Sequence, residues 1–201
     1  EEMGLLTCET EQIYRMPAVL TDLVKNRLPK AYGVNPIQDI QVLCPMNRGN
    51  AGARALNEVL QLALNPPGEG SIEKFGTTFS VGDKVMQIEN NYDRDVFNGD
   101  IGFVTRFDPE EEELTVNFDG RDVIYPYGEL DELVLCYATT IHKSQGSEYP
   151  IVVLPITMQH YVMLKRNLIY TGVTRGKRLV VMVGQKKALA MAVRGKQTLR
   201  R

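Results

Sequence analysis

Hydrophobic spacing in the first third of the chain alternates between the helical and the strand period. Apolar residues recur every three or four positions over residues 17–28, which predicts a helix, and we expect Pro29 and Gly33 to end it. The compact apolar run 39–45 predicts a buried strand. Residues 51–64 again show helical spacing and stop at a double proline. This order indicates β and α elements in alternation.

The pattern changes between residues 77 and 134, where short alternating runs are separated by turn sequences such as Asn-Gly-Asp and Asp-Gly-Arg. Such a pattern predicts a small antiparallel barrel or meander. Alternation then returns, with strands expected at 133–140, 151–155 and 178–184 and helices at 166–176 and 186–194. The chain is therefore predicted to be α/β. A discontinuous parallel-sheet domain is expected from residues 1–75 and 135–201, with an all-β module inserted at 76–134.

Composition narrows the class of protein. The 201 residues are 43% hydrophobic, enough for a buried core, and no apolar run approaches the roughly 20 residues of a membrane span. With no signal-peptide pattern at the N-terminus, we expect a cytoplasmic protein without a membrane partner. Three cysteines without a CxxC pair argue against a disulfide framework or a zinc site, and two isolated histidines add no metal ligand set.

Charge is unevenly distributed along the chain. Residues 69–132 contain 17 acidic and five basic side chains, whereas no acidic residue follows Glu148 and eleven basic ones do. The basic part suits phosphates, although solvated helix faces and a loose tail at 194–201 would give the same count. The acidic run 108–113 is interpreted as a solvated turn without a site.

Three polar stretches lie beside predicted strands of the α/β domain. Residues 44–50 and 139–148 follow strands, and 170–177 lie on the helix that leads to the last strand. Open parallel sheets bind ligands at the carboxyl ends of their strands, so we expect these stretches to meet at one edge. The serines near His142 lack a third triad member, which makes a hydrolase an unattractive interpretation.

These stretches carry a family resemblance. "YATTIHKSQGSEYPIVVLP" resembles motif V of superfamily 1 helicases, "NLIYTGVTRGKRLVVMVG" resembles motif VI, and "VLCPMNRGNAGARALNEVLQ" is similar to motif IVa. Between them, "VGDKVMQIENNYDRDVFNGDIGFV" resembles the SH3-like 2B module of the RecD/RecD2 branch, superfamily 1B. The order and combination are specific, whereas each motif alone would be weak. The chain thus resembles a RecA-like motor domain 2A with an inserted SH3-like β-barrel.

The resemblance implies an ATP-dependent 5′–3′ DNA helicase of recombination or repair. Two RecA-like domains of such motors clamp ATP with Mg²⁺ and share a track for single-stranded DNA. This chain shows neither a GxxxxGK[ST] loop nor a DE-type magnesium motif, so it is expected to be the C-terminal part and inactive as an ATPase alone. Expected partners are single-stranded DNA, the N-terminal RecA-like domain of the same protein and, for an exodeoxyribonuclease V subunit, RecB- and RecC-like chains.

The resemblance also assigns roles to residues at the nucleotide. Arg175 matches the arginine finger that reaches the γ-phosphate from the neighbouring domain, and a surface ion pair is its alternative. Gly146 and Glu148 match the nucleotide side of motif V; Glu148 could instead cap a helix. Tyr170 is left open between core and contact.

Expected DNA contacts come from three segments. Hydroxyl, imidazole and ammonium groups that donate to phosphates without reading sequence suit a motor on arbitrary DNA. Motif V supplies Thr139, Thr140, His142 and Lys143, the loop after the first strand supplies Asn47 and Arg48, and the insert supplies Asn91 and Tyr92. The alternatives are a structural role for His142, an internal ion pair for Arg48, and simple barrel turns in the insert.

Other functions stay open at this stage. Conjugative relaxase-helicases and Pif1-like helicases share much of the pattern, and only upstream sequence would separate them. A non-catalytic SH3-like binding module is the alternative from another class.

Overall fold

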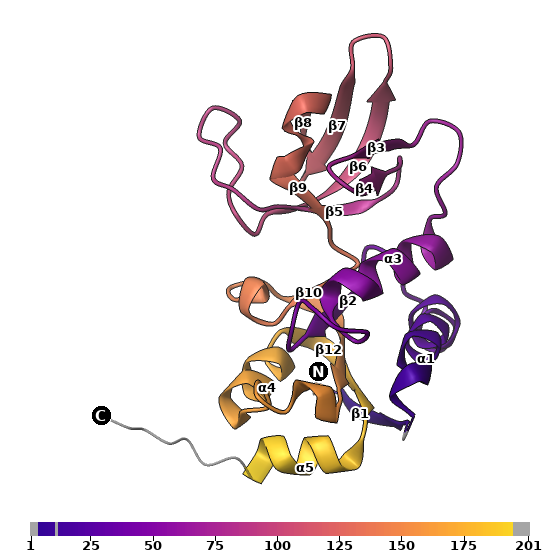
Figure 1. Cartoon of the computed structure of the whole chain (residues 1–201), viewed down its shortest axis with the longest axis vertical. Coiled ribbons are helices and arrows are strands. Elements are labelled where there is room, and N and C mark those ends of the chain that lie inside the picture. The colour runs from indigo at the N-terminus through magenta and orange to yellow at the C-terminus, as the bar shows by residue number, and fades with distance from the viewer. Residues whose placement is uncertain (1–3, 11, 195–201) are drawn as a thin grey trace. The chain divides into compact units, whose positions relative to one another are not determined.

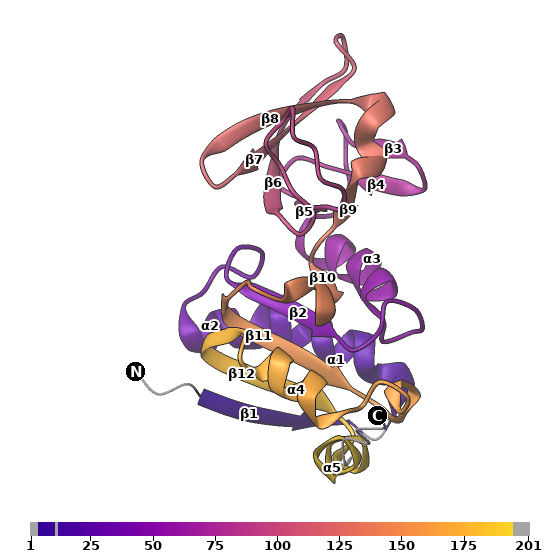
Figure 2. The same cartoon turned by 90° about the vertical axis from the view of Figure 1, so that its left-hand side faces the viewer.

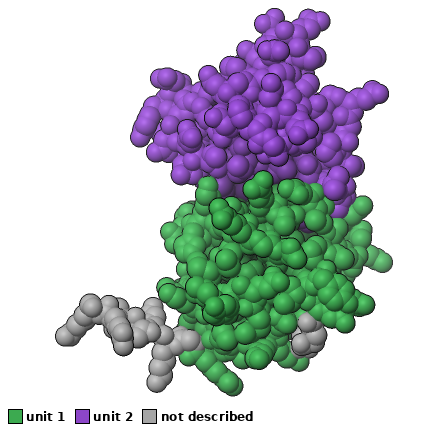
Figure 3. All heavy atoms as spheres, viewed as in Figure 1, with its two compact units in different colours: residues 1–59, 138–201 green, residues 60–137 purple. Residues whose placement is uncertain are grey.

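The computed structural model describes residues 4–10 and 12–194, and it divides into two compact units. One comprises residues 1–59 and 138–201, and the other residues 60–137 (Figure 3). The predicted insert, 76–134, lies inside the second unit, which begins earlier because the end of a helix and a β-hairpin belong to it. Most of the predicted loose tail, 194–201, falls outside the described residues.

The first unit is built on a five-stranded, fully parallel sheet of order β1-β12-β11-β2-β10. Its central strands are buried almost throughout, as expected for parallel strands covered on both faces. The strands are β1 (Gly4–Glu9), β2 (Ile40–Cys44), β10 (Ala138–Thr140), β11 (Tyr149–Ile156) and β12 (Gly176–Gly184).

Helices lie on both faces of this sheet (Figures 1 and 2). One face carries α1 (Met16–Asp22) and α2 (Leu28–Tyr32), and the other carries α4 (Arg166–Val173) and α5 (Lys186–Arg194). Within the described residues, no helix is long and apolar enough to cross a membrane.

The first predicted helix does not end at Pro29. A π-helical turn, Leu23–Arg27, joins α1 to α2, and the Leu28 amide donates to the Leu23 carbonyl. Pro29 follows this turn as the second residue of α2, so the chain stays helical through the proline. Gly33, with φ of 64°, ends the helix as expected.

The second unit is an antiparallel β structure. Its main sheet has the order β8-β7-β6-β5-β9, and β3 pairs with β4 in a separate hairpin. The boundary between the units falls within α3 (Ala53–Leu64). The strands are β3 (Ile72–Lys74), β4 (Thr77–Phe79), β5 (Lys84–Gln87), β6 (Ile101–Asp108), β7 (Glu113–Phe118), β8 (Arg121–Pro126) and β9 (Leu133–Leu135).

The acidic run forms the turn between β6 and β7, as predicted. The run 133–140, in contrast, is not one strand. Its first half pairs with β5 in the antiparallel sheet and its second half with β2 in the parallel sheet. Cys44 and Cys136 are buried free thiols, and the side chain of Cys8 lies outside the described part.

A buried carboxylate explains the "GDKVMQ" signature. Asp83 is fully buried and accepts hydrogen bonds from Tyr137, Asn65, Gln61 and the Ser80 amide at 2.6–2.8 Å. These donors tie the last turn of α3 and the segment after β9 to the start of β5. Burial raises the pKa of Asp83, and its four donors act in the opposite direction.

Candidate functional site

The expected site residues lie at two opposite edges of the parallel sheet. The loop after β2 follows its strand and Thr140 is the last residue of β10, so both lie at the carboxyl edge. Glu148 and Arg175 immediately precede β11 and β12 and therefore lie at the amino edge, where Tyr149 pairs with Gly176. The expectation of one shared edge was wrong because motif VI leads into its strand and does not follow one.

Arg175 is half-buried and held at the amino edge by weak hydrogen bonds. Its Nη1 donates to the Ser147 carbonyl at 3.2 Å and its Nη2 to the Thr174 hydroxyl at 3.4 Å, while its Nε is buried without a partner. No carboxylate among the described residues pairs with it, so the surface ion pair considered as its alternative is absent there. A guanidinium with an unused donor suits a phosphate ligand.

Glu148 and Gly146 lie just before β11. The Glu148 carboxylate forms an ion pair with Lys177 at 3.3 Å, and both side chains are 59% exposed. Glu148 precedes a strand, so the helix-capping alternative is wrong. Gly146 has φ of 83°, and no atom lies within 4 Å of a Cβ placed there. The turn therefore requires glycine by conformation and leaves open space beside the backbone.

The DNA-side residues of motif V differ in what they can present. Thr139 is buried in β10, and the Thr140 hydroxyl accepts a hydrogen bond from the Lys143 amide at 3.3 Å. His142 and Lys143 are exposed on a 3-10 turn at His142–Ser144. The hydroxyl of Ser144 is buried and donates to a carbonyl, which removes it as a nucleophile. His142 and Lys143 are thus the side chains available to a ligand.

The loop after β2 exposes Asn47 and Arg48. Arg48 has no ion pair in the described part of the chain, so the alternative of an internal partner is not found there. The amides of Ala53 and Arg54, at the start of α3, donate to carbonyls of the loop itself at 3.1 Å. These amides are therefore not available to a ligand, which leaves the side chains of Asn47 and Arg48 as the expected contacts of this loop.

Asn91 and Tyr92 occupy a loop of the second unit that is fixed from within. The Asn91 amide donates to Glu132 at 3.2 Å and its oxygen accepts from the Arg94 amide, so this side chain stabilises the loop. Tyr92 is 76% exposed and contacts Phe97 edge to face, with ring centroids 5.7 Å apart. Tyr92 remains able to contact a ligand.

Sequence reasoning missed residues on α4 and just before it. Lys165, Asn167 and Thr171 line a cavity together with His142, and the absence of acidic residues after Glu148 was the only signal for them. Tyr170 is 70% exposed, so the core alternative was wrong. In the described residues, no group of three or more His, Cys, Asp or Glu side chains could hold a metal ion.

Two family models match the chain. The "ATP-dependent RecD-like DNA helicase SH3 domain" matches residues 56–118, and the "UvrD-like helicase C-terminal domain" matches residues 135–183.

Curated relatives match over most of the chain. The ATP-dependent RecD2 DNA helicase of Deinococcus radiodurans is 40% identical over 76% of this chain, which spans 21% of that protein. The RecBCD enzyme subunit RecD of Mycolicibacterium smegmatis is 31% identical over 78% of this chain, which spans 27% of that subunit. The chain thus corresponds to about a quarter of these relatives.

Solved structures agree in fold. A Pif1 helicase from Bacteroides, in complex with ADP-AlF3 and single-stranded DNA, superposes with a TM-score of 0.59 at 15% identity, over 92% of this chain and 48% of that one. At this identity the likeness concerns the fold alone. The matches in sequence decide the family: the chain belongs to the RecD-like DNA helicases and carries their SH3 domain and a UvrD-like C-terminal helicase domain.

Proposed function

We propose that this chain is the C-terminal part of an ATP-dependent DNA helicase and forms one half of its motor. The observation that carries the proposal is the placement of motif V and motif VI. Arg175 and Glu148 lie at one edge of the sheet, and His142 lies on the connection that comes from the other edge. One domain thereby offers a nucleotide contact and a DNA contact at different places, as a motor that couples hydrolysis to movement requires.

On the nucleotide side, Arg175 is the proposed arginine finger. Bound ATP with Mg²⁺ supplies the phosphoryl group and its charge neutralisation, and the P-loop and magnesium ligands are expected in the N-terminal RecA-like domain. The guanidinium is planar and permanently charged, so it can stabilise the negative charge that grows on the γ-phosphate. Its present hydrogen bonds, at 3.2 and 3.4 Å, are long and cost little to exchange.

On the DNA side, His142 and Lys143 are proposed to bind backbone phosphates, with Asn47 and Arg48 as a second contact. Thr140 helps to shape the turn, and buried Thr139 supports it from within β10. Tyr92 is proposed as an outlying stacking contact. Contacts of this kind bind single strands without reading sequence.

The wider assembly is proposed from the family. The N-terminal RecA-like domain completes the nucleotide site, 5′–3′ polarity follows that of the RecD branch, and RecB- and RecC-like subunits are partners if the protein is an exodeoxyribonuclease V subunit.

The test replaces Arg175 by alanine in the full-length protein and uses Arg178→Ala as the control. Both positions carry a guanidinium, but Arg178 is exposed and forms no ion pair with a described residue. We expect Arg175→Ala to lower DNA-stimulated ATP turnover by roughly 10³- to 10⁵-fold. Binding of single-stranded DNA should persist in both variants.

Turnover of Arg175→Ala equal to that of the control would refute the finger assignment. Wild-type protein that binds single-stranded DNA but hydrolyses no ATP would favour a non-catalytic SH3-like binding module.

A further inference from the structure

A small cavity lies between the motif V turn and α4. Its volume is about 210 Å³, below the roughly 300–1,000 Å³ of pockets that hold whole small molecules, so it suits a single small group. The polar side chains that line it come from segments about 20 residues apart, namely His142, Gln145, Lys165, Asn167 and Thr171.

These side chains offer donors and no carboxylate. The side-chain oxygen of Asn167 already accepts a hydrogen bond from the Leu168 amide at 3.0 Å, which leaves the side-chain NH₂ group as a donor for a ligand. Thr171 donates its hydroxyl to the Asn167 carbonyl at 2.9 Å, and Lys165 is exposed without an ion pair in the described part of the chain. An amide NH₂, an ammonium and an imidazole therefore line this space, and such donors suit a group rich in hydrogen-bond acceptors.

The surrounding charge favours an anion. No acidic residue occurs in the first turn of α4, and the sequence contains none after Glu148. Tyr161, on the connection that leads into α4, is 63% exposed. Cations with an exposed aromatic ring are the composition of surfaces that track a nucleic-acid strand.

The cavity also lies on the DNA side of the sheet. β11 runs from the amino to the carboxyl edge, so α4, which follows it and leads back into β12, begins near the carboxyl edge. Its last turn ends just before Arg175. The beginning of α4 is thus the end remote from the nucleotide contact.

We propose that this cavity binds a backbone phosphate of the single strand that His142 contacts, with Lys165 and Asn167 as its donors. The proposal rests on the proposed helicase function and adds α4 to the DNA track. A phosphate of bound nucleotide has the same chemistry, and the experiment separates the two sources.

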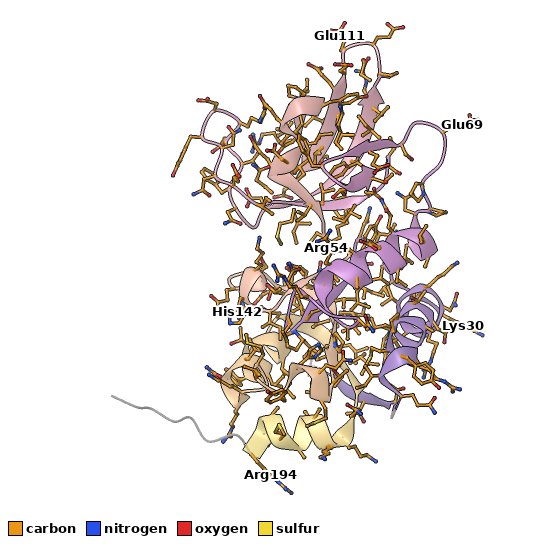
Figure 4. All side chains as sticks on the ribbon, in the orientation of Figure 1. Lys30, Arg54, Glu69, Glu111, His142 and Arg194 are labelled. Carbon is orange, nitrogen blue, oxygen red and sulfur yellow. The ribbon has the colours of Figure 1, made fainter. Side chains whose placement is uncertain are left out.

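Two variants of the full-length protein test the site. Lys165→Gln removes the ammonium. Asn167→Asp retains a side-chain oxygen that can accept the hydrogen bond from the Leu168 amide, and a carboxylate is favourable at the start of a helix. The substitution nevertheless places a negative charge in the cavity. Lys30→Gln is the control, because it also lowers the net charge by one and lies on the opposite side from His142 in Figure 4.

Binding of a fluorescein-labelled oligothymidylate is measured by anisotropy over a range of salt concentrations. We expect Lys165→Gln and Asn167→Asp each to weaken binding about fivefold, and Lys165→Gln to reduce the slope of log K against log salt by about 0.7. The control should stay within about twofold of wild type.

A double variant, His142→Ala with Lys143→Gln, separates this proposal from the function it rests on. If the double variant binds weakly while both cavity variants bind like Lys30→Gln, the cavity assignment is overturned and the DNA function stands. If wild-type protein does not bind the oligonucleotide, both fall. If the two cavity variants lose binding to a fluorescent ATP analogue and still bind the oligonucleotide like the control, the cavity is assigned to nucleotide and the DNA assignment is overturned.

Discussion

Replacement of Asp83 by asparagine tests the polar network that fixes the start of the barrel. One carboxylate oxygen accepts hydrogen bonds from the side chains of Tyr137 and Asn65. The other accepts hydrogen bonds from the Gln61 side chain and the Ser80 amide. An asparagine presents one oxygen and one NH₂ group in the same volume. Two of the four donors would then face another donor inside a fully buried site.

The magnitude follows from this count. Hydrogen bonds to a charged group contribute about 1.5–3 kcal/mol each, and a buried donor left without a partner costs about 1–3 kcal/mol. Allowing for partial relaxation, we expect Asp83→Asn to lower the free energy of unfolding of the second unit by about 3–4 kcal/mol. Tyr137→Phe removes one donor and leaves three, so it should cost about 1.5 kcal/mol.

Hydrogen exchange of the β5 and β6 amides, read by mass spectrometry, measures the second unit separately from the first. Asp119→Asn is the matched control, since Asp119 is exposed in a turn with φ of 50°, which asparagine adopts readily. If Asp83→Asn exchanges at the rate of this control, the carboxylate does not hold the barrel and the reasoning fails.

Two further predictions concern stability. Burial lowers the pKa of His160 from its ordinary value of 6.5, so the unfolded chain takes up this proton first as pH falls. We therefore expect the free energy of unfolding of the wild type, measured with urea, to decline from its value at pH of about 7.5 once the pH falls below 6.5. A His160→Gln variant should lose less stability over the same range. Equal losses in the two proteins would contradict this prediction. Arg94→Gln removes contacts with Glu129, Glu132 and the Tyr125 ring and should destabilise the second unit by about 1–2 kcal/mol, whereas Tyr92→Ala, at a 76% exposed site, should change it by less than about 0.5 kcal/mol. Equal hydrogen exchange in these two variants would show that Arg94 does not anchor the loop.

The family and the fold class could be predicted because their signals are local. Gly146 is the residue type that a left-handed turn requires, and Arg175 stands in the motif VI sequence that carries the family resemblance. The antiparallel insert was visible because turn sequences separate its alternating runs. The sequence comparisons and the similarity in fold confirm both predictions.

Other features depend on which segments meet, and no local pattern encodes that. The edge strand β1 is six residues long and has no distinctive period, so it was missed. The run 133–140 is largely buried in both halves, and burial does not tell which sheet each half joins. Gly172 lets α4 approach β11, because a Cβ there would lie 2.9 Å from a Leu154 methyl. Packing of that kind becomes visible only in three dimensions.

The motif V connection crosses the parallel sheet from one edge to the other, which bears on how the proposed contacts communicate. Ala138 and Val153 both pair with Val42, so Thr140 lies two residues beyond that level and Tyr149 four residues before it. Six residues of strand correspond to about 20 Å along the sheet. The eight intervening residues could extend to about 30 Å, but a 3-10 turn shortens them.

The connection is anchored at both ends, by β10 at the carboxyl edge and by β11 at the amino edge. Its amino-edge end is also bonded to motif VI, through the Tyr149 amide to the Arg175 carbonyl at 2.8 Å and through the Arg175 guanidinium to the Ser147 carbonyl. Movement of Arg175 toward a γ-phosphate would break the weaker of these bonds and keep the stronger. The motif V connection would then lose its side-chain contact with motif VI but keep its backbone hydrogen bond. Under the proposed function, His142 would thereby respond to the state of the nucleotide.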